Sequence, residues 1–356
     1  MKVIFLVPYP LGVAPSQRFR FEQYFSLLAI NGISYTVQSF LTEKGWRSIF
    51  ESGKIVYKAS AMITGLARRI KILTQVSEFN IVFIHREVCP FGPPFFEWFI
   101  AKILRKKIIY DFDDAIWATD KPHEGRVEKI IRWRSKVKNI CRWAYTVSCG
   151  NEYLCTYARK YNQNILLNPT TIDTHLHAPD NYAKKNNDTV TIGWTGSHST
   201  LKYVDAIVPT IQFLENKYSH IRFLVIANKK PKLNLKSLLF TPWSISSEIE
   251  DLMQIDIGIM PLPDDEWSKG KCGFKILQYM ALEVPALASP VGVNDKIVDN
   301  GNNGFLCSTQ QEWLFNLEQL INNYQLRLSM GKQGRSFIEK HYSVSSNSAN
   351  FLSLFA

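Results

Sequence analysis

The sequence has no apolar run of the roughly 18–20 residues that a membrane-spanning helix needs. Its richest stretch, Phe95–Leu104, is interrupted by Glu97 and Lys102. With 18 glycines and 16 prolines among 356 residues, a collagenous or low-complexity chain is excluded. The apolar run at the start stops at Pro8 and is too short for a signal peptide. These absences favour a globular, cytoplasmic protein. Its 356 residues are enough for two domains of ordinary size.

Metal-ligand spacing is also missing. The six cysteines form no C-x-x-C pair, so we expect reduced thiols, no bound metal and no disulfide framework. They are Cys89, Cys141, Cys149, Cys155, Cys272 and Cys307.

Charge is distributed unevenly along the chain. Residues 1–185 hold 27 Lys and Arg against 15 Asp and Glu, whereas residues 186–356 hold 15 against 16. The basic half predicts an anionic partner. No nucleic-acid-binding signature accompanies the charge, so an anionic membrane surface is the better candidate, reached peripherally from the cytoplasm. A basic helix over 125–143, which contains Trp133 and Trp143, suits that interface, although its apolar stripe would equally pack on a sheet.

Short apolar segments alternate with segments of helical length, which predicts parallel sheets flanked by helices. The expected strands are Lys2–Val7, Ser34–Ser39, Ile81–Ile84, Lys107–Tyr110, Tyr145–Ser148, Asn164–Leu167, Val190–Trp194, Ile221–Ile226, Ser237–Phe240, Ile255–Met260 and Ala286–Ala288. The expected helices are Gln17–Ile30, Pro93–Leu104, Glu124–Trp143, Asn151–Tyr161, Leu201–Tyr218, Glu248–Met253, Phe274–Leu282, Gln311–Asn322 and Leu326–Tyr342.

A polar segment at 175–188 divides the alternation into two α/β domains, which we place at 1–180 and 188–341. Ligands in such sheets bind beyond the carboxyl ends of the strands. A cleft between the two domains is therefore where we expect the site.

One glycine-rich turn opens a helix in the second half. Lys271, Gly273 and Lys275 surround the start of that helix. Free amides together with ammonium groups suit a diphosphate, although two solvated lysines in a loop would look the same.

The order of several short motifs resembles glycosyltransferase family 4, the group 1 glycosyltransferases. The resemblance implies the GT-B fold of two facing Rossmann-like domains, with a terminal helix at 342–356 returning to the first. It is carried by Leu6–Gly12, Asn168–Asp173, Asp256–Leu262, Lys275–Ala281 with Pro285–Ser289, and Asp299–Leu306.

This resemblance implies a metal-independent, retaining transfer of a sugar from a nucleotide diphosphate-sugar, without a further cofactor. The second domain would bind the donor and the first an acceptor hydroxyl. Lys202 and Lys275 would neutralise the leaving diphosphate. The residues expected around the donor are Gly12, Gly196, Ser197, Gly273, Lys271 and Gln278, with the alternative that Ser197 is only a helix cap.

The sequence departs from the family at its usual pair of glutamates. Gln278 and Gly270 stand at the two positions. A glutamine carbonyl still accepts a hydrogen bond from ribose, but glycine has no side chain that could replace the other glutamate. Asp264, Asp265 or Glu266 would have to reach the donor from a longer loop.

Three carboxylates follow one strand of the first half. We expect Asp113 and Asp114 to orient the acceptor and assist proton removal, with Asp111 structural. The alternative is a metal-binding D-x-D of a GT-A-type transferase, built on Asp111 and Asp113. The acceptor side also includes Arg18, Arg20 and His85, unless the arginines are exposed charges and the histidine is structural.

The sequence therefore predicts a glycosyltransferase that uses a sugar or lipid-linked acceptor in cell-envelope polysaccharide or glycolipid synthesis. Besides the metal-dependent alternative, a non-catalytic nucleotide-sugar-binding protein stays open because the glutamates are missing.

Overall fold

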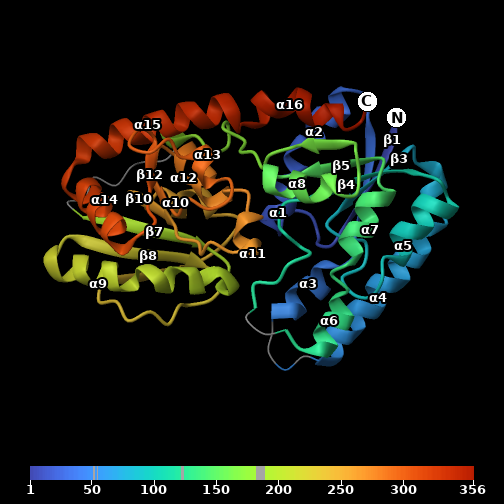
Figure 1. The fold of residues 1–356 in the computed structure, drawn as a ribbon, viewed down its shortest axis with the longest axis horizontal. Helices are drawn as coiled ribbons and strands as arrows, with labels where there is room; N and C mark the ends of the chain where they lie inside the picture. The colour runs from blue at the N-terminus through green and yellow to red at the C-terminus, as the bar shows by residue number, and fades with distance from the viewer. Residues whose placement is uncertain (51–52, 54, 122–123, 182–188) are drawn as a thin grey trace. The chain divides into compact units, whose positions relative to one another are not determined.

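Short apolar strands form two separate parallel sheets in the computed structural model, which describes all residues except 51, 52, 54, 122, 123 and 182–188 (Figure 1). Unit 1 contains Met1–Thr170, Lys269–Cys272 and Asn347–Ala356, and unit 2 contains Thr171–Ser268 and Gly273–Ser346. The division thus falls at Thr170 rather than at residue 180. Part of the polar segment expected to link the domains, 182–188, lies outside the described residues.

Unit 1 is built on a sheet with strand order β2-β1-β3-β4-β5-β6. The continuous apolar runs of β1 and β3 are buried, as expected for strands covered on both faces. The strands are β1 Lys2–Val7, β2 Ser34–Ser39, β3 Ile81–His85, β4 Lys107–Phe112, β5 Thr146–Cys149 and β6 Ile165–Leu167.

Helices surround this sheet, and several are short. They are α1 Pro15–Arg18, η1 Glu22–Tyr24, α2 Phe25–Ile30, α3 Glu43–Phe50, α4 Ile55–Leu73, η2 Val76–Glu78, α5 Phe95–Trp98, the π-helix η3 Phe99–Ile103, α6 Arg126–Arg132, α7 Lys136–Trp143 and α8 Glu152–Arg159. The last helix, α16 Val344–Ser353, returns from Asn347 onward to unit 1. There Phe351 stacks on Tyr24 at 4.2 Å between ring centroids.

The single basic helix expected over 124–143 is wrong, because α6 and α7 are separate. Trp133 takes a left-handed backbone conformation with φ 47° and ends α6. α7 buries Val137, Ile140 and Cys141, whereas no residue of α6 is buried. The alternative of packing on the sheet therefore applies to α7 alone.

Unit 2 has a sheet of order β12-β11-β10-β7-β8-β9. Its strands are β7 Val190–Gly196, β8 Ile221–Ala227, β9 Leu238–Pro242, β10 Ile257–Met260, β11 Ala286–Ala288 and β12 Gly304–Leu306. Its helices are η4 Pro179–Asn181, η5 His198–Ile207, α9 Val208–Lys217, α10 Glu248–Leu252, α11 Glu266–Lys269 (whose Lys269 clusters with unit 1), α12 Phe274–Ala281, α13 Asn294–Ile297, α14 Gln310–Asn322 and α15 Tyr324–His341.

The chain reverses its direction of travel across each sheet at one point. In unit 1 this switch lies between β1 and β3, and in unit 2 between β7 and β10. Loops beyond the carboxyl ends of such neighbouring strands are where open α/β sheets bind ligands. The candidate ligand-binding residues are therefore those after β1, β3 and β4 in unit 1, and those after β7 and β10 in unit 2.

Candidate functional site

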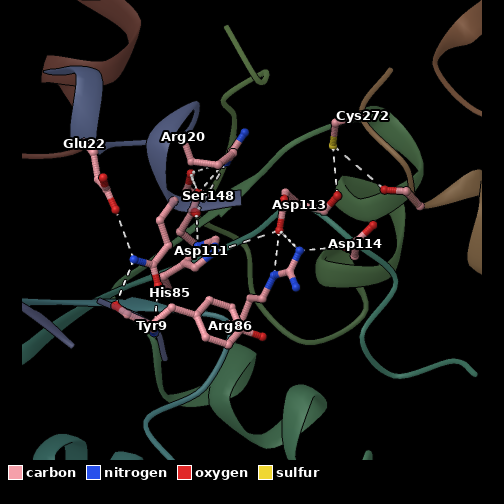
Figure 2. A network of polar contacts seen from close by, with 12 residues as sticks. Tyr9, Arg20, Glu22, His85, Arg86, Asp111, Asp113, Asp114, Ser148 and Cys272 are labelled. Atoms are coloured by element: carbon pink, nitrogen blue, oxygen red, sulfur yellow. Dashed lines mark hydrogen bonds and ion pairs between the residues drawn. The ribbon is translucent and has the colours of Figure 1, made fainter. Parts of the chain in front are cut away.

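Asp111 lies at the centre of a buried polar network in unit 1 (Figure 2). Its carboxylate forms an ion pair with Arg20 and accepts hydrogen bonds from Ser148 Oγ at 2.6 Å and His85 Nδ1 at 2.8 Å. Burial alone disfavours its charge, but the charge of Arg20 and the hydrogen bond from His85 hold the pKa of Asp111 well below its usual range. Asp111 is therefore an ionised structural carboxylate, in the role that its sequence position suggested.

His85 is fully buried at the end of β3. Because the ionised Asp111 accepts from Nδ1, this nitrogen carries a proton, and the bond fixes the orientation of the ring. Nε2 lies 4.0 Å from Asp113 Oδ1 and has no hydrogen-bond partner among the described residues. The bond from Nδ1 to Asp111 thus directs the other side of the His85 ring toward Asp113, which follows β4.

Arg86, which follows His85 and for which the sequence predicted no role, holds the carboxylates of Asp113 and Asp114. Its Nε donates to Asp113 at 2.8 Å and its Nη2 to Asp114 at 2.6 Å. Its φ of 59° is unusual for a side chain of this size. β4 fixes this conformation, since Arg86 N donates to the Asp111 carbonyl and the Tyr110 hydroxyl donates to the Arg86 carbonyl. Its position directly after a strand was the signal available beforehand.

The segment Lys269–Cys272 packs on the same carboxylates within unit 1. Lys271 Nζ lies 3.3 Å from Asp114 Oδ1, and the Cys272 thiol donates to the Asp113 carbonyl at 3.1 Å. Burial raises the pKa of Cys272, so this thiol stays protonated. The structure thus pairs Lys271 with Asp114, and its role at the helix start of the donor site stays a prediction.

Gly270 explains part of this packing. A Cβ at this position would lie 2.4 Å from the backbone nitrogen of Ala115, closer than real atoms approach. The position where the family resemblance requires a glutamate therefore has no room for one as the backbone lies here. Asn151 fixes the backbone by donating to the carbonyls of Lys269 at 3.2 Å and Lys271 at 2.9 Å.

The other predicted site residues of unit 1, Arg18 and Arg20 on the acceptor side and Gly12 on the donor side, occupy different settings. Arg20 is buried, and it also donates to the carbonyl of Asn168, so its expected contact with an acceptor is corrected to a structural role. Arg18 is half-buried, with its guanidinium carbon 4.9 Å from the Phe19 ring centroid. Gly12, with φ 78°, follows β1 and donates its N–H to the half-buried Glu22, whose pKa burial raises.

In unit 2, the end of β7 meets helix α12. Tyr279 accepts a hydrogen bond from the Thr195 amide at 3.0 Å. Lys275 Nζ lies 5.5 Å from the ring centroid of the buried Trp194. A Cβ on Gly196 would meet both the Trp194 ring and Lys275 Cε at 2.7–3.0 Å. Two predicted donor-site residues, Gly196 and Lys275, are therefore neighbours at the switch point.

The start of α12 is shaped by Gly273. It precedes the helix with φ 68°, and a Cβ there would lie 2.2 Å from Ile297 Cδ1. The first turn of a helix leaves backbone N–H groups without partners inside the helix, and these carry partial positive charge. Gln278 lies one turn beyond Lys275, buried, and its Nε2 has no hydrogen-bond partner within the described chain.

Other predicted donor residues lie on the surface of unit 2. Lys202 is exposed on η5, with Nζ 5.3 Å from the Tyr203 ring centroid. Ser197 precedes η5, but its hydroxyl bonds the hydroxyls of Ser199 and Thr200 and caps no backbone amide. Asp264, Asp265 and Glu266 are exposed, and Asp265 accepts from the Ser268 amide at 2.6 Å.

Across the described part of the chain, no three His, Cys, Asp or Glu side chains gather in a way that would hold a metal ion. Within the same residues, no helix combines the length and apolarity needed to cross a bilayer.

Residues 189–323 match the family model described as Glycosyl transferases group 1. The matched segment includes β7, α12 and the neighbouring Gly196 and Lys275. The resemblance to group 1 glycosyltransferases is therefore confirmed over residues 189–323. A comparison with curated protein sequences finds no match.

Solved structures share the fold at low sequence identity. Sucrose-phosphate synthase from Thermosynechococcus elongatus aligns over 100% of this chain and 98% of its own, with TM-score 0.68 and 11% identity. HepE from Anabaena, solved with UDP and glucose, aligns over 100% and 99%, with TM-score 0.66 and 14% identity. TarM aligns over 82% of this chain at TM-score 0.62 and 15% identity, and this chain spans 58% of TarM.

These likenesses establish the GT-B fold of glycosyltransferases. The alternative of a GT-A-type fold is therefore wrong. Of its two proposed metal ligands, Asp111 is also enclosed by Arg20 and His85.

Proposed function

We propose that this GT-B-fold protein, with its group 1 glycosyl transferase segment, transfers a sugar from a nucleotide diphosphate-sugar to an acceptor hydroxyl. Unit 2 binds the donor and unit 1 supplies acceptor-side groups. The observation that carries the proposal is the β7–α12 junction, where Gly196, Gly273 and Lys275 lie inside the matched segment.

The chemistry follows from this junction. Breaking the bond between the sugar C1 and the phosphate oxygen places negative charge on the departing diphosphate. The ammonium of Lys275 and the N–H groups of the first turn of α12 stabilise that charge, with Lys202 as a second cation. The acceptor oxygen bonds to C1 on the same face, and its proton passes to a phosphate oxygen. The reaction retains the sugar configuration and requires no metal.

On the acceptor side, Asp113 is the better-placed carboxylate. Arg86 Nε donates to its carboxylate and the Cys272 thiol donates to its carbonyl, so its position is fixed from two sides. We infer that Asp113 and Asp114 orient the acceptor hydroxyl. Gln278 binds the donor through its amide, where the family carries a carboxylate. The basic first half supports a sugar or lipid-linked acceptor of the cell envelope, used at the cytoplasmic face of the membrane.

Donor binding tests the proposal directly. We expect UDP, UDP-sugars or GDP-sugars to raise the unfolding temperature, because a ligand that binds only the folded state stabilises it. UDP is the first probe because HepE was solved with it. In Lys275→Ala, affinity should fall roughly 10–100-fold, the worth of one hydrogen bond to a charged group. Lys296→Ala, an exposed lysine of unit 2, is the matched control. If no nucleotide raises the unfolding temperature of the protein, the proposal is contradicted.

A second candidate is a nucleotide-sugar-binding protein without activity. The specific observation in its favour is Gly270, where the backbone leaves no room for the acid that the family resemblance requires. The two candidates differ in turnover. Donor hydrolysis or transfer that Lys275→Ala abolishes supports the enzyme, whereas donor binding without product release over hours supports the binder.

A further inference from the structure

We propose that the exposed sides of α4 and α6 form a docking surface for an anionic lipid bilayer. We call it the α4–α6 surface and define it by Val56, Ile63, Ile70, Lys71, Arg126, Val127, Lys129, Ile130, Ile131 and Arg132. The proposal concerns where unit 1 binds and does not depend on the transfer reaction.

α4 presents an aliphatic stripe to solvent. Val56, Ile63 and Ile70 are 80%, 67% and 62% exposed. They are spaced by seven residues, so they lie along one side of the helix. The buried residues Gly65, Arg69 and Ile72 lie on the opposite side. Large aliphatic side chains on the solvent side of a helix indicate an interaction surface.

α6 combines the same feature with positive charge. Val127 and Ile130 are 70% and 64% exposed, Ile131 is 51% exposed, and no residue of this helix is buried. Arg126, Lys129 and Arg132 alternate with them along the same seven residues. The helix has one acid, Glu128, whose carboxylate pairs with Lys121 at 2.6 Å.

Contacts within unit 1 connect both helices to the loop between β3 and α5. Arg69 of α4 donates to the carbonyl of Val88 at 2.8 Å, and the amide of Gly92 donates to the carbonyl of Ile131 of α6 at 2.7 Å. Arg69 also donates to carbonyls of Val7 and Gln38, so α4 is anchored by its buried side. Figure 1 shows both helices at the same end of unit 1.

Charge decides which partner fits. α4 contains no acidic residue, and its exposed Lys71 adds to the three cations of α6. Aliphatic side chains interleaved with Lys and Arg insert at the boundary between acyl chains and anionic headgroups. A second copy of the chain would bring the same positive charges together, so self-association is disfavoured. An anionic bilayer supplies both the apolar layer and the opposite charge.

Vesicle flotation with the full chain tests the surface. We expect the protein to float with vesicles of phosphatidylglycerol and phosphatidylcholine, to stay behind with phosphatidylcholine alone, and to lose binding as salt rises. The double variant Ile63→Glu/Ile130→Glu should reduce flotation at least tenfold. Phe213→Glu/Phe315→Glu, which replaces two exposed aromatics of unit 2, is the matched control and should bind normally.

Two results would overturn the proposal. One is flotation of the Ile63→Glu/Ile130→Glu variant equal to that of the natural chain. The other is a dimer, detected by light scattering without lipid, that the same variant dissociates. Circular dichroism and a UDP thermal shift establish that the variant is folded. A failure of UDP binding in the natural chain would contradict the proposed function but not this surface.

Discussion

At the scale of single residues, Asp111 joins four parts of unit 1. It sits at the end of β4 and contacts Arg20 after α1, His85 of β3 and Ser148 of β5. Removing one partner of a buried ion pair leaves the other charge without compensation, which costs far more than an exposed pair would.

We therefore expect Asp111→Asn to lower the free energy of unfolding at pH 7 by about 3–5 kcal/mol. Because the pKa of Asp111 is lowered in the folded state, the unfolded carboxyl takes up a proton first as the pH falls. The contribution is complete above about pH 5 and is lost progressively below about pH 4. Urea unfolding at several pH values should show that the free energies of unfolding of the variant and the natural chain approach each other as the pH falls. A constant difference would contradict the assignment. Asp295→Asn, at an exposed site, should change stability by less than about 0.5 kcal/mol.

Residue types alone located much of the candidate site but not the roles of its members. Asp113, Asp114 and His85 were found because polar residues directly after buried strands gather at one sheet edge. Arg20 was misassigned because its partner, Asp111, is 91 residues away in sequence. The pairing of Lys271 with Asp114 was missed for the same reason, since the sequence around each residue carries no signal of the other.

At the scale of elements, buried strands were predictable and helices less so. β1 and β11 have the predicted bounds, because short apolar runs between turns have few alternatives. β2 also has its predicted bounds, although none of its residues is buried. β12 was not assigned as a strand, since Gly304–Leu306 is too short to show a pattern. α3 and α4 were missed. The exposed aliphatics of α4 obscure the usual contrast between a polar and an apolar face.

Asn151 offers a test of how α8 and the segment Lys269–Cys272 depend on each other. Its Oδ1 caps α8 by accepting from the Leu154 amide, while its Nδ2 donates to Lys269 and Lys271. Asn151→Asp keeps the cap and loses the donor, whereas Asn151→Ala loses both. We expect both variants to speed tryptic cleavage after Lys269 or Lys271, measured by mass spectrometry.

The control for this prediction is another helix cap. Thr309→Ala removes the cap of α14 in unit 2 and should cost about 1 kcal/mol without changing cleavage at 269–271. If Asn151→Ala and Thr309→Ala are cleaved there at the same rate, the donor bonds of Asn151 do not hold the segment.

At the scale of the whole molecule, unit 1 is assembled from three separated stretches of sequence. The last stretch contributes Phe351, stacked on Tyr24, and Phe355, whose ring centroid lies 6.4 Å from that of Phe5. Unit 2 has its own core, in which Ile192, Phe223 and Leu317 are fully buried.

A chain ending at Ser346 should therefore lose stability in unit 1 alone. Removing a buried aromatic side chain costs about 3–5 kcal/mol, and this truncation removes two. Calorimetry should show the unfolding transition of unit 1 shifted to lower temperature and that of unit 2 unchanged. Phe315→Ala, at an exposed position of α14, should shift neither. An unaltered transition for unit 1 would show that Asn347–Ala356 adds nothing to it.

The return of α16 also sets the order in which a nascent chain can mature. Domains usually fold from the N-terminus while the ribosome is still translating. Here unit 1, whose sheet is translated first, needs aromatic rings encoded after all of unit 2, because Phe351 and Phe355 belong to unit 1. Unit 2 is thus translated whole before unit 1 has all its parts, so the sheet that leaves the ribosome first is the later of the two to be completed.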